Sequence, residues 1–239
     1  MMRVFLTSVL VLLPICASFA ADDHTSPVRV TPLVPPEVQW EPDAVPDRIV
    51  LSWSDDPSTT MSVTWRTDTT VQQAVAEIAR AESGPRFATR KKLIRAESQS
   101  LETDLGPSLR HTVTFRGLQP QTQYLYRVGD GSNWSEWAEF RTASAEVAPF
   151  SFVYFGDAQN EVKSHWSRVV RRAFRDAPKA SFFLHAGDLI NRSESDAEWG
   201  EWFYAGGFIH RSTPCVATPG NHEFGRIGDS DRRRLSVHW

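Results

Sequence analysis

Three short apolar runs in the C-terminal half of this chain are each followed by a glycine and then at once by a polar residue. The runs cover residues 150–155, 180–185 and 214–218, and segments with apolar residues at roughly helical spacing lie between them, at 161–176 and 196–203. Buried strands that alternate with helices are typical of an α/β layer. A chain of 239 residues is long enough for such a layer and one further domain.

The polar residues that follow the three runs are Asp157, Asp188 and Asn221. Because ligands gather at the carboxyl ends of the strands in open α/β sheets, we expect these side chains to converge on one edge. Carboxylate and amide oxygens suit hard or borderline divalent metals, and two such metals about 3.5–4 Å apart can clamp a phosphate. The pattern predicts a two-metal site in which Asp188 is the natural bridging carboxylate. The alternative is that these residues only cap helices or stabilise turns.

Residues 46–143 have the pattern of an antiparallel β-sandwich. Apolar and polar residues alternate at 61–66 and 111–115, which is the period of a half-buried strand. Further strands are expected at 48–53, 124–128 and 137–140. Residues 71–82 fit either a strand or a helix by composition, and we interpret them as a strand.

The N-terminus has the composition of an export signal. Basic Arg3 precedes a short apolar run, and Ser18 and Ala20 offer small residues for cleavage. Residues 1–20 are therefore interpreted as a signal peptide rather than an uncleaved anchor helix. Recurrent prolines make residues 21–45 a linker in which helix is unfavourable. We expect a secreted or periplasmic protein with no membrane segment after cleavage.

Charge and cysteine content narrow the class of protein further. The formal net charge of −3 gives no electrostatic reason to expect nucleic acid as a partner. Signal cleavage would remove Cys16 and leave Cys215 without an intrachain partner, so a hydrophobic core has to hold the fold. His185 lies on one of the apolar runs, where a packed structural side chain is favoured over a ligand. The oligomeric state stays open.

Two groups of residues resemble known families. Residues 118–128, in which Tyr124 follows a Leu-x-Pro turn, look like the end of a fibronectin type III domain with its tyrosine corner. Together with residues 62–66 they resemble the N-terminal sandwich of purple acid phosphatases. The ordered set Gly156-Asp157, Gly187-Asp188 and Gly220-Asn221-His222-Glu223 is similar to the calcineurin-like metallophosphoesterases. The resemblance implies a fibronectin-like β-sandwich followed by a partial α/β phosphoesterase domain over residues 149–239.

The same resemblance implies a role for each matching residue. Asp157 would bind the first metal, Asp188 would bridge both metals, and Asn221 would bind the second through its amide oxygen. His222 would not ligate, but would face the phosphate and protonate the leaving oxygen or stabilise charge in the transition state. Gln159 stands where many relatives have His, and its carbonyl oxygen is a further candidate ligand. The metals implied are Fe, Zn or Mn.

Two departures from the family pattern limit these expectations. Asn191 occupies the position of the Tyr that colours purple acid phosphatases, so we expect no purple chromophore. The family also needs two further His-bearing motifs, and His238 is the only histidine after the third motif. We therefore interpret the sequence as a truncated phosphoesterase that binds metal poorly as given and has little or no activity.

The function implied for the complete protein is hydrolysis of phosphate esters by attack of a metal-bound hydroxide, as in an acid phosphatase. A phosphodiesterase or nucleotidase of the same superfamily is the enzyme alternative. A non-catalytic exported binding module, in which the sandwich alone acts, is the alternative from another class.

Overall fold

The computed structural model describes residues 34–226 and 232–238. The predicted signal peptide and the first part of the predicted linker lie outside these residues. In the described part of the linker the structure has a short helix, α1 (Pro36–Gln39), where the proline content argued against one. Pro36 stands at the start of the helix, where a missing N–H costs no hydrogen bond. The amides of Val38 and Gln39 instead bond to the carbonyl of Pro35, at 3.0 and 2.9 Å.

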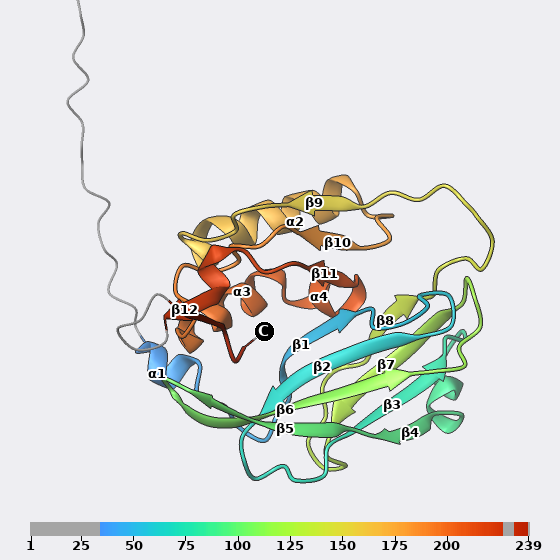
Figure 1. The fold of residues 1–239 in the computed structure, drawn as a ribbon. Coiled ribbons are helices and arrows are strands. Elements are labelled where there is room, and N and C mark those ends of the chain that lie inside the picture. Colours follow the sequence, from blue (N-terminus) through green and yellow to red (C-terminus); the bar gives the residue numbers. More distant parts are fainter. Residues whose placement is uncertain (1–33, 227–231, 239) are drawn as a thin grey trace, which may run out of the picture. The chain divides into compact units, whose positions relative to one another are not determined.

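The N-terminal domain is a sandwich of two four-stranded antiparallel sheets (Figure 1). One sheet has the order β1-β2-β6-β5 and the other β4-β3-β7-β8. The strands are β1 (Asp47–Ser52), β2 (Met61–Thr67), β3 (Val75–Arg80), β4 (Lys92–Arg95), β5 (Glu97–Thr103), β6 (Gly106–Phe115), β7 (Gln123–Gly129) and β8 (Ala138–Arg141). A 3-10 turn, η1 (Pro85–Thr89), lies between β3 and β4.

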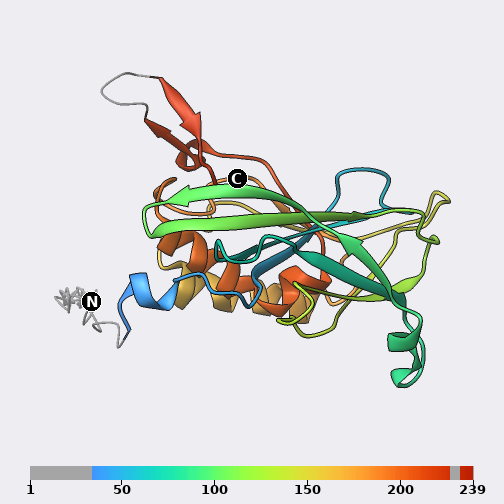
Figure 2. The ribbon, with the colours of Figure 1, turned by 90° about the horizontal axis from the view of Figure 1, so that it is seen from below.

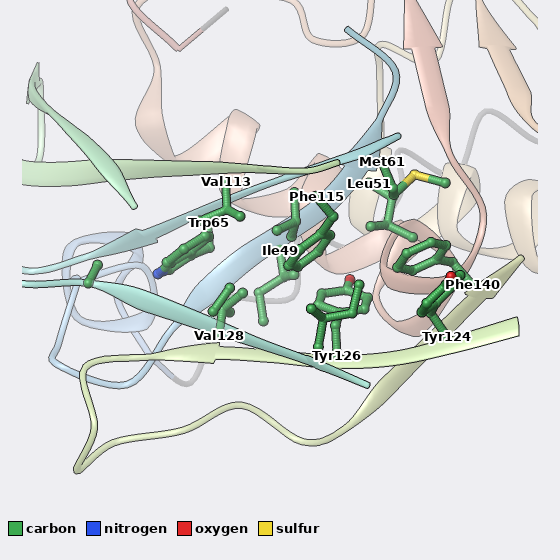
Figure 3. Close-up of a cluster of buried hydrophobic side chains, with 14 of the residues drawn as sticks. Ile49, Leu51, Met61, Trp65, Val113, Phe115, Tyr124, Tyr126, Val128 and Phe140 are labelled. Atoms are coloured by element: carbon green, nitrogen blue, oxygen red, sulfur yellow. The ribbon is translucent and has the colours of Figure 1, made fainter. Parts of the chain in front are cut away.

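Inward-facing residues of both sheets form the core of the sandwich, which Figure 3 shows from the side. Strand β7 alternates buried and half-buried residues, as its sequence predicts. The hydroxyl of Tyr124 accepts a hydrogen bond of 2.9 Å from the backbone N–H of Gln119, which is the predicted tyrosine corner. The segment with ambiguous composition is strand β3, so the interpretation as a strand is confirmed.

The C-terminal region is built on a three-stranded parallel sheet of order β11-β10-β9. Figure 1 shows these strands side by side, with the helices next to them. The elements are β9 (Val153–Phe155), η2 (Val162–Trp166), α2 (Ser167–Asp176), β10 (Phe183–His185), α3 (Asp196–Gly206), α4 (Phe208–Ser212) and β11 (Cys215–Ala217). A core of buried residues from the strands and helices joins the two layers. The prediction of a sandwich followed by an α/β layer is therefore confirmed.

Details of this region differ from the prediction. Each strand is only three residues long, so the strands are shorter than the apolar runs that predicted them. The first helix begins with a π-helical turn after Glu161, whose φ of 52° is left-handed. A 3-10 turn, η3 (Asn221–Glu223), precedes the antiparallel pair β12 (Phe224–Arg226) and β13 (Arg233–Leu235), which was not predicted. Figure 2 shows this orange-red pair standing away from the sandwich strands.

Asp196, the first residue of α3, holds α3 against the sandwich. Its fully buried carboxylate accepts hydrogen bonds from Arg48 at 2.6 and 2.8 Å, from Arg66 at 3.0 Å and from His238 at 2.9 Å. Burial alone would raise the pKa of Asp196, but the hydrogen bonds from His238 and Arg48 hold it well below its ordinary value. A buried carboxylate with these partners is ionised at neutral pH.

Within the described residues no helix is both long enough and apolar enough to cross a bilayer.

Candidate metal centre

The candidate ligands follow the ends of three parallel strands that lie in register. Phe155 pairs with His185, and His185 pairs with Ala217, so the carboxyl ends of β9, β10 and β11 lie at the same edge of the sheet. Asp157 comes two residues after β9, and Asp188 comes three residues after β10. Both have a φ near +50°, a conformation that non-glycine residues rarely adopt. Backbone strain of this kind is often found at functional sites.

Hydrogen bonds connect the three segments through Asp188. The backbone N–H of Gln159 donates to the carbonyl oxygen of Asp188 at 3.0 Å, which joins the first segment to the second. The backbone N–H of His222 donates to Oδ1 of Asp188 at 2.9 Å, which joins the third segment to the second. Asp188 is therefore central among the three motifs, as a bridging carboxylate would need to be.

Two glycines allow the second and third segments to approach each other this closely. A Cβ atom on Gly220 would lie 2.3 Å from Oδ1 of Asp188 and 2.7 Å from its backbone nitrogen. A Cβ atom on Gly187 would lie 2.3 Å from the nitrogen of Gly220, and Gly187 also has a φ of +92°. Both contacts are shorter than a real Cβ tolerates, so only glycine fits at these two positions.

Glu223 also connects the second and third segments, at a contact called the junction below. Its carboxylate is fully buried and accepts backbone N–H bonds from Asp188 at 2.9 Å, from Leu189 at 2.7 Å and from Gly220 at 2.7 Å. These three bonds hold the backbone of the second and third segments together. The sequence places Glu223 in the third motif but predicts no role for it, because its three donors come from distant positions or from the backbone of its own motif.

His222 is oriented by the backbone of Asn191. Its Nδ1 lies 2.7 Å from the carbonyl oxygen of Asn191. Because a carbonyl only accepts, Nδ1 carries a proton, and Nε2 is the nitrogen left for other partners. Glu198 in turn fixes Asn191, since its carboxylate accepts the Asn191 backbone N–H at 2.8 Å. Asn191 thus has a positioning role through its backbone, although its side chain lacks the phenol that the resemblance expects.

The residues present fit an oxygen-liganded metal site. Asp157 and Asn221 are exposed, Asp188 is half-buried, and all three offer oxygen atoms, which hard and borderline cations prefer. Oε1 of Gln159 is buried and has no hydrogen-bond partner among the described residues. An unpaired buried acceptor costs about 1–3 kcal/mol, and a cation is a partner that an oxygen acceptor can bind.

Comparison with known proteins follows the same division of the chain. Residues 46–142 match the family described as the purple acid phosphatase N-terminal domain. Residues 150–239 match the family described as calcineurin-like phosphoesterase.

Curated relatives resemble most of this chain but extend well beyond it. Acid phosphatase type 7 of Homo sapiens is 32% identical over 197 residues, which cover 76% of this chain and 41% of the relative. Acid phosphatase type 7 of Mus musculus is 32% identical over 200 residues, which cover 77% of this chain and 42% of the relative. The chain thus spans about two fifths of the length of these relatives.

Solved structures share the fold at low sequence identity. The purple acid phosphatase PPD1 from yellow lupin (Lupinus luteus) seeds has a TM-score of 0.63 at 17% identity, over 78% of this chain and 37% of that one. A structure of PhoD has a TM-score of 0.52 at 17% identity, over 75% of this chain and 40% of that one.

Proposed function

We propose that this chain, a member of the calcineurin-like phosphoesterase family with a purple acid phosphatase-like N-terminal sandwich, serves the hydrolysis of phosphate esters. The observation that carries the proposal is the position of Asp188, whose backbone and carboxylate connect all three metal-binding motifs at one sheet edge. The curated relatives are acid phosphatases by name, so a phosphate monoester is the substrate class proposed first.

In this proposal each candidate residue keeps the role that its motif implies. Asp157 would hold the first metal, Asp188 would hold both, and Asn221 would hold the second, with Gln159 as an additional oxygen ligand. Fe, Zn and Mn suit this donor set. Two such metals, when bound, would act as Lewis acids on the phosphate and would lower the pKa of bound water. The chain itself fixes the spacing of the ligands, because Glu223 and the two close glycines hold the segments together.

His222 is the proposed general acid. Its Nδ1–H bond to the Asn191 carbonyl sets the plane of the ring and leaves Nε2 as the atom that can bind and release a proton. A protonated Nε2 would donate to the leaving oxygen of the ester, and an unprotonated Nε2 would take a proton back after release. Because the hydrogen bond to the Asn191 carbonyl fixes the orientation of the ring, Nε2 stays in place in both its protonated and its unprotonated form.

We also propose that the protein works outside the cytoplasm. The apolar N-terminal segment with small residues at Ser18 and Ala20 is the basis for this proposal. The proposed organisation is a signal peptide over 1–20, a linker over 21–45, the sandwich over 46–143 and the phosphoesterase region over 149–239. Nucleic acid is not proposed as a partner. Sequencing of the N-terminus of the secreted protein tests the cleavage site, and an intact Met1 would contradict it.

The experiment that tests the catalytic proposal compares two carboxylate variants. Asp188→Asn keeps the size of the side chain and removes the bridging charge, whereas Asp176→Asn changes an exposed carboxylate on α2. After incubation with Mn²⁺, Zn²⁺ or Fe²⁺, we expect Asp188→Asn to retain about one tenth or less of the metal that the unmodified chain binds, and Asp176→Asn to retain all of it. Hydrolysis of an aryl phosphate, however slow in the unmodified chain, should fall in the same proportion in Asp188→Asn. Metal binding to the unmodified chain that Asp188→Asn leaves unchanged would refute the proposal.

A further inference from the structure

A second group of metal-ligand side chains lies in the interior of the α/β region, apart from the oxygen-rich sheet edge. His185 of β10, His210 of α4 and Cys215 of β11 place their ligand atoms within 4.8 Å of one another. Their side chains are 1%, 0% and 7% exposed. Among the described residues no further Cys, His or carboxylate joins the group.

The register of the sheet explains why these residues meet. Cys215 pairs with Phe183, and His185 stands two residues after Phe183 on the same strand. Side chains two residues apart and side chains of paired residues point to the same face of a sheet, so His185 and Cys215 share one face. That face packs against the helices. Helix α4 then brings His210 onto it.

Gly206 leaves space for the ring of His210. A Cβ atom on Gly206 would lie 2.1 Å from the imidazole of His210, so glycine is required next to the ring. Trp202 stacks on His210 with ring centroids 4.4 Å apart and meets His185 edge-on at 5.4 Å. The cluster therefore has a fixed aromatic wall.

The ring nitrogens of the cluster lack hydrogen-bond partners among the described residues. Both ring nitrogens of His185 and both of His210 are buried without a hydrogen bond to any described residue. Sγ of Cys215 donates a 3.7 Å hydrogen bond to the carbonyl oxygen of Thr213. Burial lowers the pKa of His185 to about 4 and the pKa of His210 to about 3, so both rings are neutral and each has a nitrogen lone pair available. Each neutral ring thus offers one unpaired acceptor nitrogen to the cluster, and two such buried acceptors point to an occupant, since buried polar groups are nearly always paired.

The chemistry of the three ligands selects the occupant. Two imidazoles and a thiol offer no oxygen, which argues against Mg²⁺ and Ca²⁺ and favours soft or borderline ions. Structural Zn²⁺ sites almost always have four ligands, whereas three are present here. A monovalent ion with one thiolate and two neutral imidazoles has no net charge, but Zn²⁺ would leave a positive charge among aromatic rings, where burial of charge is costly.

We propose that His185, His210 and Cys215 form a buried binding site for Cu⁺, separate from the phosphoesterase metal centre. Binding replaces the Cys215 proton with the metal and releases that proton to solvent, because the thiolate is the ligand. Metal–ligand bonds of about 2.0–2.3 Å require ligand atoms about 3.5 Å apart, so side-chain shifts of about 1 Å close the site. The interior position means that the ion enters as the chain folds.

The test uses the full chain produced with copper and refolded anaerobically with Cu⁺ and a reductant. We expect one copper per chain, and an X-ray absorption spectrum that fits one sulfur and two nitrogen neighbours. Cys215→Ala and His210→Phe should each lower copper binding at least tenfold. Two control variants should retain it: His165→Phe, which changes an exposed histidine, and Asp188→Asn, which changes only the phosphoesterase centre. The Asp188→Asn result also separates this proposal from the proposed catalytic function.

A second measurement covers the case in which a variant fails to fold. Bound Cu⁺ should protect Cys215 of the unmodified chain from a thiol reagent during brief denaturant pulses, and should raise its thermal midpoint. Copper-independent labelling, a spectrum without sulfur, unchanged binding in Cys215→Ala, or tighter binding of Zn²⁺ than Cu⁺ in direct competition would each overturn the proposal.

Discussion

The backbone N–H of His222 donates a 2.9 Å hydrogen bond to Oδ1 of Asp188, so the proposed general acid is attached to the proposed bridging ligand. One oxygen of the carboxylate is thereby fixed in space before any metal arrives. The same residue pair fixes the distance between the third motif and the second. Substitutions that change this junction should therefore affect metal binding and stability together.

Gly220→Ala should damage the junction, whereas Gly156→Ala should not. The added methyl at Gly220 would meet Oδ1 and the nitrogen of Asp188, and overpacking of this kind costs about 1–3 kcal/mol. At Gly156 the nearest atom to an added Cβ is 4.0 Å away, so that variant is a matched control from the first motif. Urea unfolding and metal titration measure the two effects. Equal behaviour of the two variants would show that the close approach is unimportant.

Glu223→Gln should destabilise the chain by about 2–4 kcal/mol, because the amide has one acceptor oxygen where three N–H groups need acceptors. The amide N–H₂ would also face those donors. The exposed Glu97→Gln on β5 is the control, and its unfolding midpoint should stay at the wild-type value. A Glu223→Gln protein with wild-type stability would show that the three hydrogen bonds to Glu223 are not needed to hold the second and third segments together.

The sandwich should lose stability on acidification because of His111. This ring is fully buried between the hydroxyls of Thr67 and Ser98, each 2.8 Å away, and burial lowers its pKa to about 4. The unfolded chain, with a pKa of about 6.5, takes up the proton first. Stability is therefore complete above about pH 6.5 and is lost as the pH falls toward 4, by about 2–3 kcal/mol in total.

Chemical denaturation between pH 7 and pH 4 measures this loss. His111→Gln keeps a polar side chain that can bond to both hydroxyls but does not titrate, so its stability should fall less over this range. His165→Gln changes an exposed ring and should follow the wild-type curve. A wild-type slope in His111→Gln would assign the acid sensitivity to another group.

The sequence predicted most of the strands because their residues alternate or run apolar, and alternation depends only on local pattern. Strands β4 and β5 were missed for the same reason: their residues are mostly exposed, as in Lys92–Arg95, so no apolar period marks them. Helix α1 was not predicted because residues 21–45 contain five prolines, although proline is favourable at the first helical position.

Asp157, Asp188 and Asn221 were predictable as candidate ligands because each one follows a glycine near the end of an apolar run. Their connections were not, since Glu223 reaches Leu189 across 34 positions of sequence. The cluster of His185, His210 and Cys215 was still harder to predict. Sequence reasoning favoured a packed structural role for His185 and noted Cys215 as unpaired. Only the strand register and the position of α4 place these residues together.

Asp196→Ala should be the most destabilising of the carboxylate substitutions, because it leaves the buried side chains of Arg48 and Arg66 without their shared partner. Removal of one member of a buried ion pair costs about 3–5 kcal/mol, and here two guanidinium groups lose a partner at once. Asp176→Ala on α2 is the control, since its pairs with Arg172 and Arg175 are exposed and contribute little to stability. Urea unfolding compares the two variants. If Asp196→Ala unfolded at the same urea concentration as Asp176→Ala, the buried carboxylate would have no role in holding α3 to the sandwich.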